Sequence, residues 1–233
     1  MGYYYVNART KHIDAILFDA LTKKAKQVVN LGAGYDSRAY RFHQMAPEVR
    51  YFEVDLPEMS VDKKIRVKEI LGALPDWVGY VPIDFNKQTL GEELIKAGYD
   101  KNKKTLFIWE GVTMYLSSEA VTSTLHFVAN QSSPESSIVF DYIPYSVDQI
   151  NKSKQTDTWG NGREEMPGEP FIYGIEGDKL ETFLGQLGLK LVSDLGISEL
   201  ADKYLVQANG RIVFGHIDGG SIACAIVPDR DQK

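Results

Sequence analysis

The sequence predicts an α/β fold in which helices cover both faces of a mostly parallel sheet. Short, strongly apolar segments alternate with helical segments over residues 27–142, a pattern typical of parallel strands buried on both faces. Near the C-terminus two apolar runs flank Asp218-Gly219-Gly220, which predicts an antiparallel hairpin. With 233 residues, of which 43% are hydrophobic, we expect one globular domain over residues 1–233.

The individual elements follow from periodicity and from turn signals. The predicted strands are short runs rich in β-branched and aromatic residues: 27–31, 51–55, 78–83, 105–110, 137–142, 189–195, 211–217 and 221–227. The first predicted helix begins at Thr10, which can act as its N-cap, and carries apolar residues at helical spacing. The later predicted helices are 35–45, 57–74, 89–97, 117–130, 178–187 and 198–205.

Composition argues against several classes of protein. The net charge is −6, whereas nucleic-acid binders usually carry a basic stripe. No apolar run approaches the roughly 18 residues of a membrane helix, and residues 1–9 lack the apolar core of a secretory signal. The single cysteine, Cys224, allows neither an internal disulfide nor a cysteine metal cluster. We expect a cytoplasmic protein with no metal and no nucleic-acid or membrane partner, of unspecified oligomeric state.

A glycine turn follows the first predicted strand, and an acid closes the second. Gly32 and Gly34 let the backbone turn tightly and let a ligand lie against it, although a turn that serves packing alone is the alternative. Asp55 can accept hydrogen bonds from both hydroxyls of a ribose, so we expect a nucleoside site. Ser37 replaces the third glycine of a dinucleotide fingerprint, and Asp36 would repel a pyrophosphate. A cationic ligand such as S-adenosylmethionine meets no such objection.

Four segments carry more specific motifs. They are residues 7–14, residues 28–42 with Asn-Leu-Gly-Ala-Gly-Tyr-Asp-Ser-Arg, residues 51–57 with Tyr-Phe-Glu-Val-Asp-Leu-Pro, and residues 107–116 with Phe-Ile-Trp-Glu-Gly-Val-Thr-Met-Tyr-Leu. In these motifs the chain resembles the leucine carboxyl methyltransferase family, also called PPM-type O-methyltransferases, which use S-adenosylmethionine. The resemblance implies a Rossmann-like methyltransferase fold with a mostly parallel seven-stranded sheet, a C-terminal antiparallel hairpin and an irregular lid segment.

The resemblance also implies how the amino-acid part of the cofactor is held. Arg9, expected just before the first helix, would pair with the methionine carboxylate, and Glu110 would hold the α-amino group. Gly32, Ala33 and Gly34 would lie against the same part. The alternative without ligand binding is that Glu110 caps the following turn and that Arg9 is a surface residue.

For the adenosine part, the resemblance implies a second set of residues. Asp55, with Leu56 beside it, would take the ribose hydroxyls. Asp84 and Phe85 would bracket the adenine, with Asp84 accepting from its exocyclic amine. Independently of the resemblance, Asp55, Asp84 and Glu110 all fall at the carboxyl ends of predicted strands, where ligands of parallel sheets bind.

The acceptor side gives weaker signals. Residues 144–175 contain several prolines and glycines but also the aromatic residues Trp159, Phe171 and Tyr173, so we expect a substrate lid there, with a disordered segment as the alternative. Aromatic side chains after the fourth and fifth strands or in this segment could line an acceptor pocket or simply pack: Tyr115, Tyr142, Tyr145 and Trp159. No catalytic base is assigned, and His216 and Tyr115 are the weak candidates.

Three functions compete at this point. The first is an O-methyltransferase acting on a hydroxyl or carboxyl group of a small molecule. The second is a carboxyl methyltransferase acting on a protein C-terminus, and the third is a cofactor-binding protein without catalysis. Protein-directed family members carry more chain before the first motif than the eight residues that precede Arg9 here. We therefore expect a small-molecule acceptor.

Overall fold

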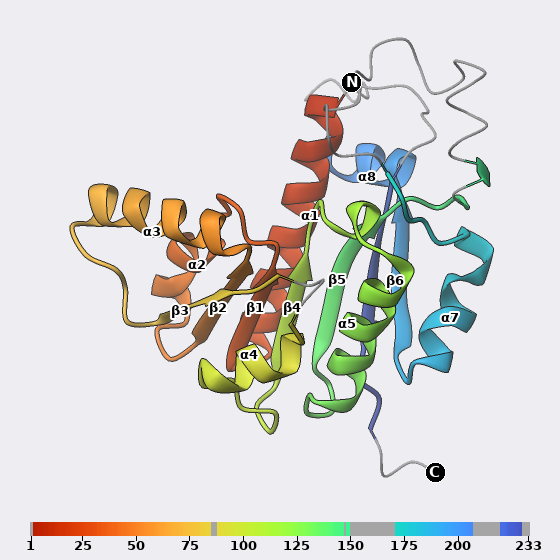
Figure 1. Cartoon of the computed structure of the whole chain (residues 1–233). Helices are drawn as coiled ribbons and strands as arrows, with labels where there is room; N and C mark the ends of the chain where they lie inside the picture. The colour runs from red at the N-terminus through yellow and green to blue at the C-terminus, as the bar shows by residue number, and fades with distance from the viewer. Residues whose placement is uncertain (1, 85–87, 147, 150–170, 207–219, 230–233) are drawn as a thin grey trace.

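A computed structural model describes residues 2–84, 88–146, 148–149, 171–206 and 220–229 of the chain (Figure 1). The strands are β1 Gln27–Leu31, β2 Arg50–Asp55, β3 Val78–Pro82, β4 Thr105–Trp109, β5 Ser137–Tyr142, β6 Lys190–Gly196 and β7 Ser221–Ile226. The helices are α1 Gly2–Thr22, α2 Arg38–Arg41, α3 Pro57–Leu71, α4 Leu90–Lys96, α5 Ser118–Asn130, α7 Leu180–Gln186 and α8 Ile197–Tyr204, with 3-10 turns η1 His43–Met45, η2 Thr113–Tyr115 and η3 Gly177–Lys179.

The strands form one seven-stranded sheet with the order β3-β2-β1-β4-β5-β7-β6. Strands β1 to β5 pair in parallel, whereas β7 runs antiparallel to both β5 and β6. The predicted mostly parallel sheet with an antiparallel C-terminal strand is therefore confirmed. The first arm of the predicted hairpin, residues 211–217, lies outside the described residues.

Two apolar layers hold the helices against the sheet. On one face α4, α5 and α7 contribute Leu94, Leu125 and Leu184 to a cluster of fully buried side chains. On the other face α1 and α8 cover the sheet, with Leu17 and Leu200 in the second cluster (Figure 1). Burial of this apolar surface on both faces explains why the strands read as continuous apolar runs in the sequence.

Helix α1 begins at Gly2, so the prediction that Thr10 caps its N-terminus is wrong. The helix continues toward the N-terminus because Ala8 is buried in the layer that α1 shares with the sheet, and Tyr5 packs against the same layer. Arg9 consequently lies inside α1 instead of just before it. This position fixes the backbone from which the Arg9 side chain reaches the sheet.

The predicted helix over residues 35–45 is divided. Asp36 Oδ1 accepts a hydrogen bond from the Arg38 backbone N–H at 2.7 Å, a local turn that delays helix α2 until Arg38. The last residues form the separate turn η1. Helix α3 also ends earlier than predicted, at Leu71, because Gly72 adopts the left-handed conformation of a C-cap at φ +81°. The N-cap of helix α5 is Ser117, whose side chain accepts a hydrogen bond from the Ala120 N–H.

In the part of the chain that the structure describes, no helix combines the length and apolar character needed to cross a bilayer.

The glycine turn after β1 is tightly packed against the loop after β4. Gly32 has φ +67°, and a Cβ atom added there would overlap Val112 Cγ2. We predict that Gly32→Ala lowers the free energy of unfolding by about 2 kcal/mol or more, because backbone strain and overlap both act. Gly98 is the matched control: it has φ +93° but nothing within 4 Å of an added Cβ. Urea unfolding checks this, and an equal loss for Gly98→Ala would contradict the proposed close approach.

Candidate active site at the carboxyl edge of the sheet

Four neighbouring parallel strands bring the predicted ligand-binding residues to one edge of the sheet. The glycine turn follows β1, Asp55 ends β2, Asp84 follows β3 and Glu110 follows β4. The chain leaves β1 toward β2 on one side, while β4 pairs with β1 on the other side. Such a reversal of strand order opens a crevice at the carboxyl ends of the strands, where α/β proteins bind ligands.

Asp55 lies directly against the glycine turn. Its Oδ2 accepts a hydrogen bond from the Gly34 backbone N–H at 2.5 Å, and its Oδ1 accepts from the Leu56 N–H at 2.7 Å. The Gly32 and Ala33 N–H groups donate to the Val54 carbonyl oxygen at 2.8 and 3.0 Å. The structure thus brings together the turn and the acid that the sequence singled out. The assignment of Asp55 to a ribose stays a prediction.

A buried ion pair between Lys63 and Glu53 contacts the backbone of the glycine turn, and the sequence analysis did not predict it. Lys63 of α3 donates to the Ala33 carbonyl oxygen at 3.3 Å, and its Nζ lies 2.8 Å from Glu53 Oε1. The Tyr40 hydroxyl donates to Glu53 Oε2 at 3.1 Å. Burial raises the pKa of the Glu53 carboxyl, and the Lys63 ammonium acts against that rise. The sequence feature that could have predicted this pair is Glu53, an acid within the otherwise apolar strand β2.

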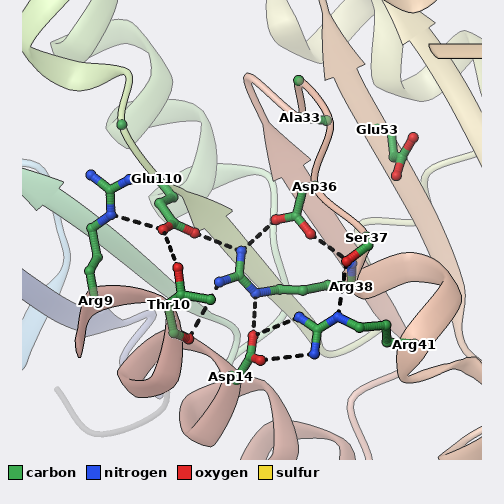
Figure 2. Close-up of polar contacts among 12 residues, drawn as sticks. Arg9, Thr10, Asp14, Ala33, Asp36, Ser37, Arg38, Arg41, Glu53 and Glu110 are labelled. Carbon is green, nitrogen blue, oxygen red and sulfur yellow. Dashed lines mark hydrogen bonds and ion pairs between the residues drawn. The ribbon is translucent and has the colours of Figure 1, made fainter. Parts of the chain in front are cut away.

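Arg9 and Glu110, expected at opposite ends of the cofactor's amino-acid part, contact each other (Figure 2). Arg9 Nε donates to Glu110 Oε1 at 2.8 Å, and a second Arg9 nitrogen donates to Asp141 Oδ2 at 2.6 Å. Asp141 of β5 is completely buried, and its other oxygen accepts from the Gly111 N–H at 2.6 Å. Burial raises the pKa of the Asp141 carboxyl, while the Arg9 guanidinium and this N–H oppose the rise.

A second arginine, to which the sequence reasoning gave no role, holds Glu110 from the other side. Arg38 donates to Glu110 Oε2 at 2.7 Å and to Asp14 Oδ1 at 2.6 Å, and it also pairs with Asp36 (Figure 2). Its weakest contact is to the Thr10 carbonyl oxygen at 3.5 Å. Arg38 is only 3% exposed, so nearly all of its guanidinium contacts are internal. We call Arg9, Arg38, Asp14, Asp36, Glu110 and Asp141 the ionic cluster.

The remaining predicted residues lie in the loops after β3 and β4 or outside the described part of the chain. The Asp84 N–H donates to Gln88 Oε1 at 3.1 Å in the turn after β3. Phe85, Trp159 and His216 lie outside the described residues. Tyr115 lies in η2, and its ring centroid is 5.4 Å from that of Phe171.

Two of the candidate pocket aromatics belong to apolar clusters. Tyr142 is 1% exposed, and its hydroxyl donates to Asp194 Oδ2 at 2.8 Å. Its contacts are those of a core residue and not of a pocket wall. Tyr145 packs against Met114 and Ile143. These contacts do not identify an acceptor pocket.

The C-terminal end of the predicted lid returns to the same edge of the sheet. The Ile172 N–H donates to the Met114 carbonyl oxygen at 2.9 Å, and the Ile175 N–H donates to the Ile143 carbonyl oxygen at 2.9 Å. These two acceptors follow β4 and β5. Residues 171–175 therefore lie beside the loops that follow both strands, whereas residues 150–170 lie outside the described part.

The ionic cluster makes a pH-dependent prediction about stability. Arg9→Met leaves the buried Asp141 carboxylate without its cation, which we expect to cost about 3 kcal/mol of unfolding free energy at pH 8. The loss of unfolding free energy should be smaller at pH 5. The pKa of Asp141 is raised in the folded state, so its ionised form lowers stability at pH values above the pKa of the unfolded chain. This penalty disappears once the carboxyl is protonated. Urea unfolding at both pH values checks this. Adding Asp141→Asn should restore stability at pH 8, and a pH-independent loss would contradict the prediction.

Comparison with known proteins gives one family and a group of relatives. A family model described as leucine carboxyl methyltransferase matches residues 1–129. A protein of Bacillus subtilis named putative S-adenosyl-L-methionine-dependent methyltransferase YktD is 30% identical over 200 residues, which are 84% of this chain and 64% of the relative. A protein of Mycolicibacterium paratuberculosis, also named a putative S-adenosyl-L-methionine-dependent methyltransferase, is 34% identical over 184 residues, 77% of this chain and 59% of the relative. The chain thus spans less than two thirds of these relatives.

Solved structures with little sequence identity share the fold. Magnesium protoporphyrin IX methyltransferase from Synechocystis, solved with bound SAH, superposes with a TM-score of 0.57 at 12% identity, over 94% of this chain and 83% of that one. A putative methyltransferase solved with the Haloferax volcanii activator Trm112 superposes with a TM-score of 0.54 at 14% identity, over 97% and 96% of the two chains. At such identities these structures support the Rossmann-like fold alone.

Proposed function

The chain belongs to the leucine carboxyl methyltransferase family, and from this membership we propose that it transfers the methyl group of S-adenosylmethionine to an oxygen atom of a small molecule. The resemblance seen in the sequence motifs is confirmed by the match over residues 1–129. The observation that carries the proposal is the meeting of the glycine turn, Asp55, Arg9 and Glu110 at one edge of the sheet. We further propose a single cytoplasmic domain in which residues 144–175 form the substrate lid.

The residues present suit the cofactor chemically. An amino acid carries one ammonium and one carboxylate, and the ionic cluster offers carboxylates and guanidinium groups that complement both. A Cβ added to Gly34 meets nothing within 4 Å, so open space borders the turn beside Asp55. Bound at this edge, S-adenosylmethionine supplies an electrophilic methyl group on a sulfonium.

The proposed division of labour follows the two parts of the cofactor. Asp55 and Leu56 hold the ribose, while Asp84 and Phe85 hold the adenine. Arg9 and Glu110 hold the amino-acid part, against which Gly32, Ala33 and Gly34 lie. Because methyl transfer is an in-line displacement, the main task of these residues is alignment, and fixed positioning lowers the barrier by removing orientational freedom.

Two kinds of oxygen acceptor remain in the proposal. A carboxylate is already ionised at neutral pH and needs no base, whereas a hydroxyl profits from one. Tyr115 is a weak candidate base because η2 places it shortly after Glu110, while His216 lies outside the described residues. The competing functions are methylation of a protein C-terminal carboxylate and cofactor binding without catalysis.

Transfer of a labelled methyl group separates these functions. With radiolabelled S-adenosylmethionine and an extract as the source of acceptors, we predict label in extractable small molecules. Label in a base-labile ester on protein would support the protein-directed alternative. Absence of transfer, together with tight binding of the donor, would support the non-catalytic alternative and overturn the proposal.

Asp55 should contribute directly to cofactor affinity. Asp55→Ala removes two charge-assisted hydrogen bonds, each worth roughly 1.5–3 kcal/mol, and we expect S-adenosylhomocysteine to bind at least about tenfold more weakly. Calorimetry checks this, with Asp19→Ala as a matched control, because Asp19 is an exposed acid that pairs with Lys23. An unchanged dissociation constant for Asp55→Ala, or tighter binding of NAD to the unaltered protein, would contradict the assigned site.

A further inference from the structure

Arg9 and Arg38 both form ion pairs with Glu110, and they differ in the number and burial of their other charged partners. We propose that Arg38 is a positioning residue that permanently anchors Glu110, and that Arg9 is the partner that Glu110 exchanges for the ammonium group of a bound amino-acid moiety. This inference rests on the proposed function, because it takes the ionic cluster as the site for the amino-acid part. It adds a role for Arg38, and it identifies the Arg9–Glu110 ion pair as the contact that a bound amino-acid moiety would replace.

Arg38 is fixed on every side. Its guanidinium contacts three carboxylates that come from three separate parts of the chain: Asp14 in α1, Asp36 in the turn after β1, and Glu110 after β4. Its side chain is 4% exposed, against 13% for Glu110. A planar guanidinium with several charged partners is geometrically locked, and its removal would leave those carboxylates without a cation. Arg38 therefore has no contact that it can give up cheaply.

Arg9 is bound less completely. One of its two ion pairs is to Asp141, which is completely buried and cannot lose its cation without a large cost. Its other ion pair is to Glu110, which keeps Arg38 as a second cation when Arg9 departs. The contact that can be released is therefore the one between Arg9 and Glu110.

The two carboxylate oxygens of Glu110 accept from different arginines. Oε2 accepts from Arg38, while Oε1 faces Arg9 and also accepts from the Thr10 hydroxyl at 3.2 Å (Figure 2). Exchange at Oε1 leaves the Arg38 contact intact. The released Arg9 donor then meets the carboxylate of the ligand, and Oε1 meets its ammonium. Because the incoming group is a zwitterion, the exchange replaces one ion pair by two without changing the net charge of the site.

A double-mutant cycle tests this role, with Arg41 as the matched control. Arg41 contacts the same Asp14, but its Nε donates to Ser37 Oγ and not to Glu110, and its side chain is 45% exposed. The probes are S-adenosylhomocysteine, which has the amino-acid part, and methylthioadenosine, which lacks it. We expect Arg38→Lys to weaken the first about tenfold, by loss of a charged hydrogen bond, while Arg41→Lys changes it less than about twofold. Methylthioadenosine should bind all variants about equally.

The cycle adds Glu110→Gln alone and in combination. If Arg38 acts through Glu110, Arg38→Lys causes no further loss in the Glu110→Gln background. Asp14→Asn, which loosens Arg38 without touching Glu110, should give the same loss confined to S-adenosylhomocysteine, and it keeps the test valid if Arg38→Lys does not fold.

Three outcomes would overturn the inference. Equal weakening of both probes would show that Arg38 acts through the fold, and additive losses in the double variant would show that it does not act through Glu110. In both cases the unaltered protein still binds S-adenosylhomocysteine, so the proposed function stands. Failure of the unaltered protein to bind that probe would overturn the proposed function and this inference together.

Discussion

The contact of Glu110 with the guanidinium groups of Arg9 and Arg38 is the interaction on which the candidate site depends. It joins helix α1, the segment after β1 and the loop after β4, which are far apart in the sequence. Charged groups withdrawn from water are stable only when they are paired, so this cluster forms only when all three segments are in place. The same contact therefore couples the position of α1 to the edge of the sheet where a ligand would bind.

The charge balance of this edge bears on the kind of ligand. Within the ionic cluster and Arg41, which pairs with Asp14, four carboxylates, Asp14, Asp36, Glu110 and Asp141, face three guanidinium groups, those of Arg9, Arg38 and Arg41. One negative charge is in excess, which favours a ligand that carries positive charge over a pyrophosphate. The sequence argument from Asp36 pointed the same way, although in the structure Asp36 acts mainly as a partner of Arg38.

Local signals made most of the fold predictable, and long-range contacts account for what was missed. The apolar strands, the glycine turn and the Ser117 cap are each encoded within a few residues, and all three are present. The true start of α1 depends on burial of Ala8 against residues that are distant in the sequence. Arg38 meets Asp14 and Glu110 across 24 and 72 positions, and no short motif encodes such pairings.

The adenosine side and the amino-acid side of the proposed site differ in whether a ligand has to displace an existing contact. On the adenosine side, the backbone N–H groups of Gly34 and Leu56 already hold the two oxygens of the Asp55 carboxylate in place. Such a side is preorganised, because its groups need no new arrangement to receive a ligand. On the amino-acid side, each charge is already satisfied by a neighbour, so a ligand has to replace an existing ion pair. Since Arg9 lies within a regular helix, that replacement requires only a change of side-chain partners, and the backbone of α1 can stay where it is.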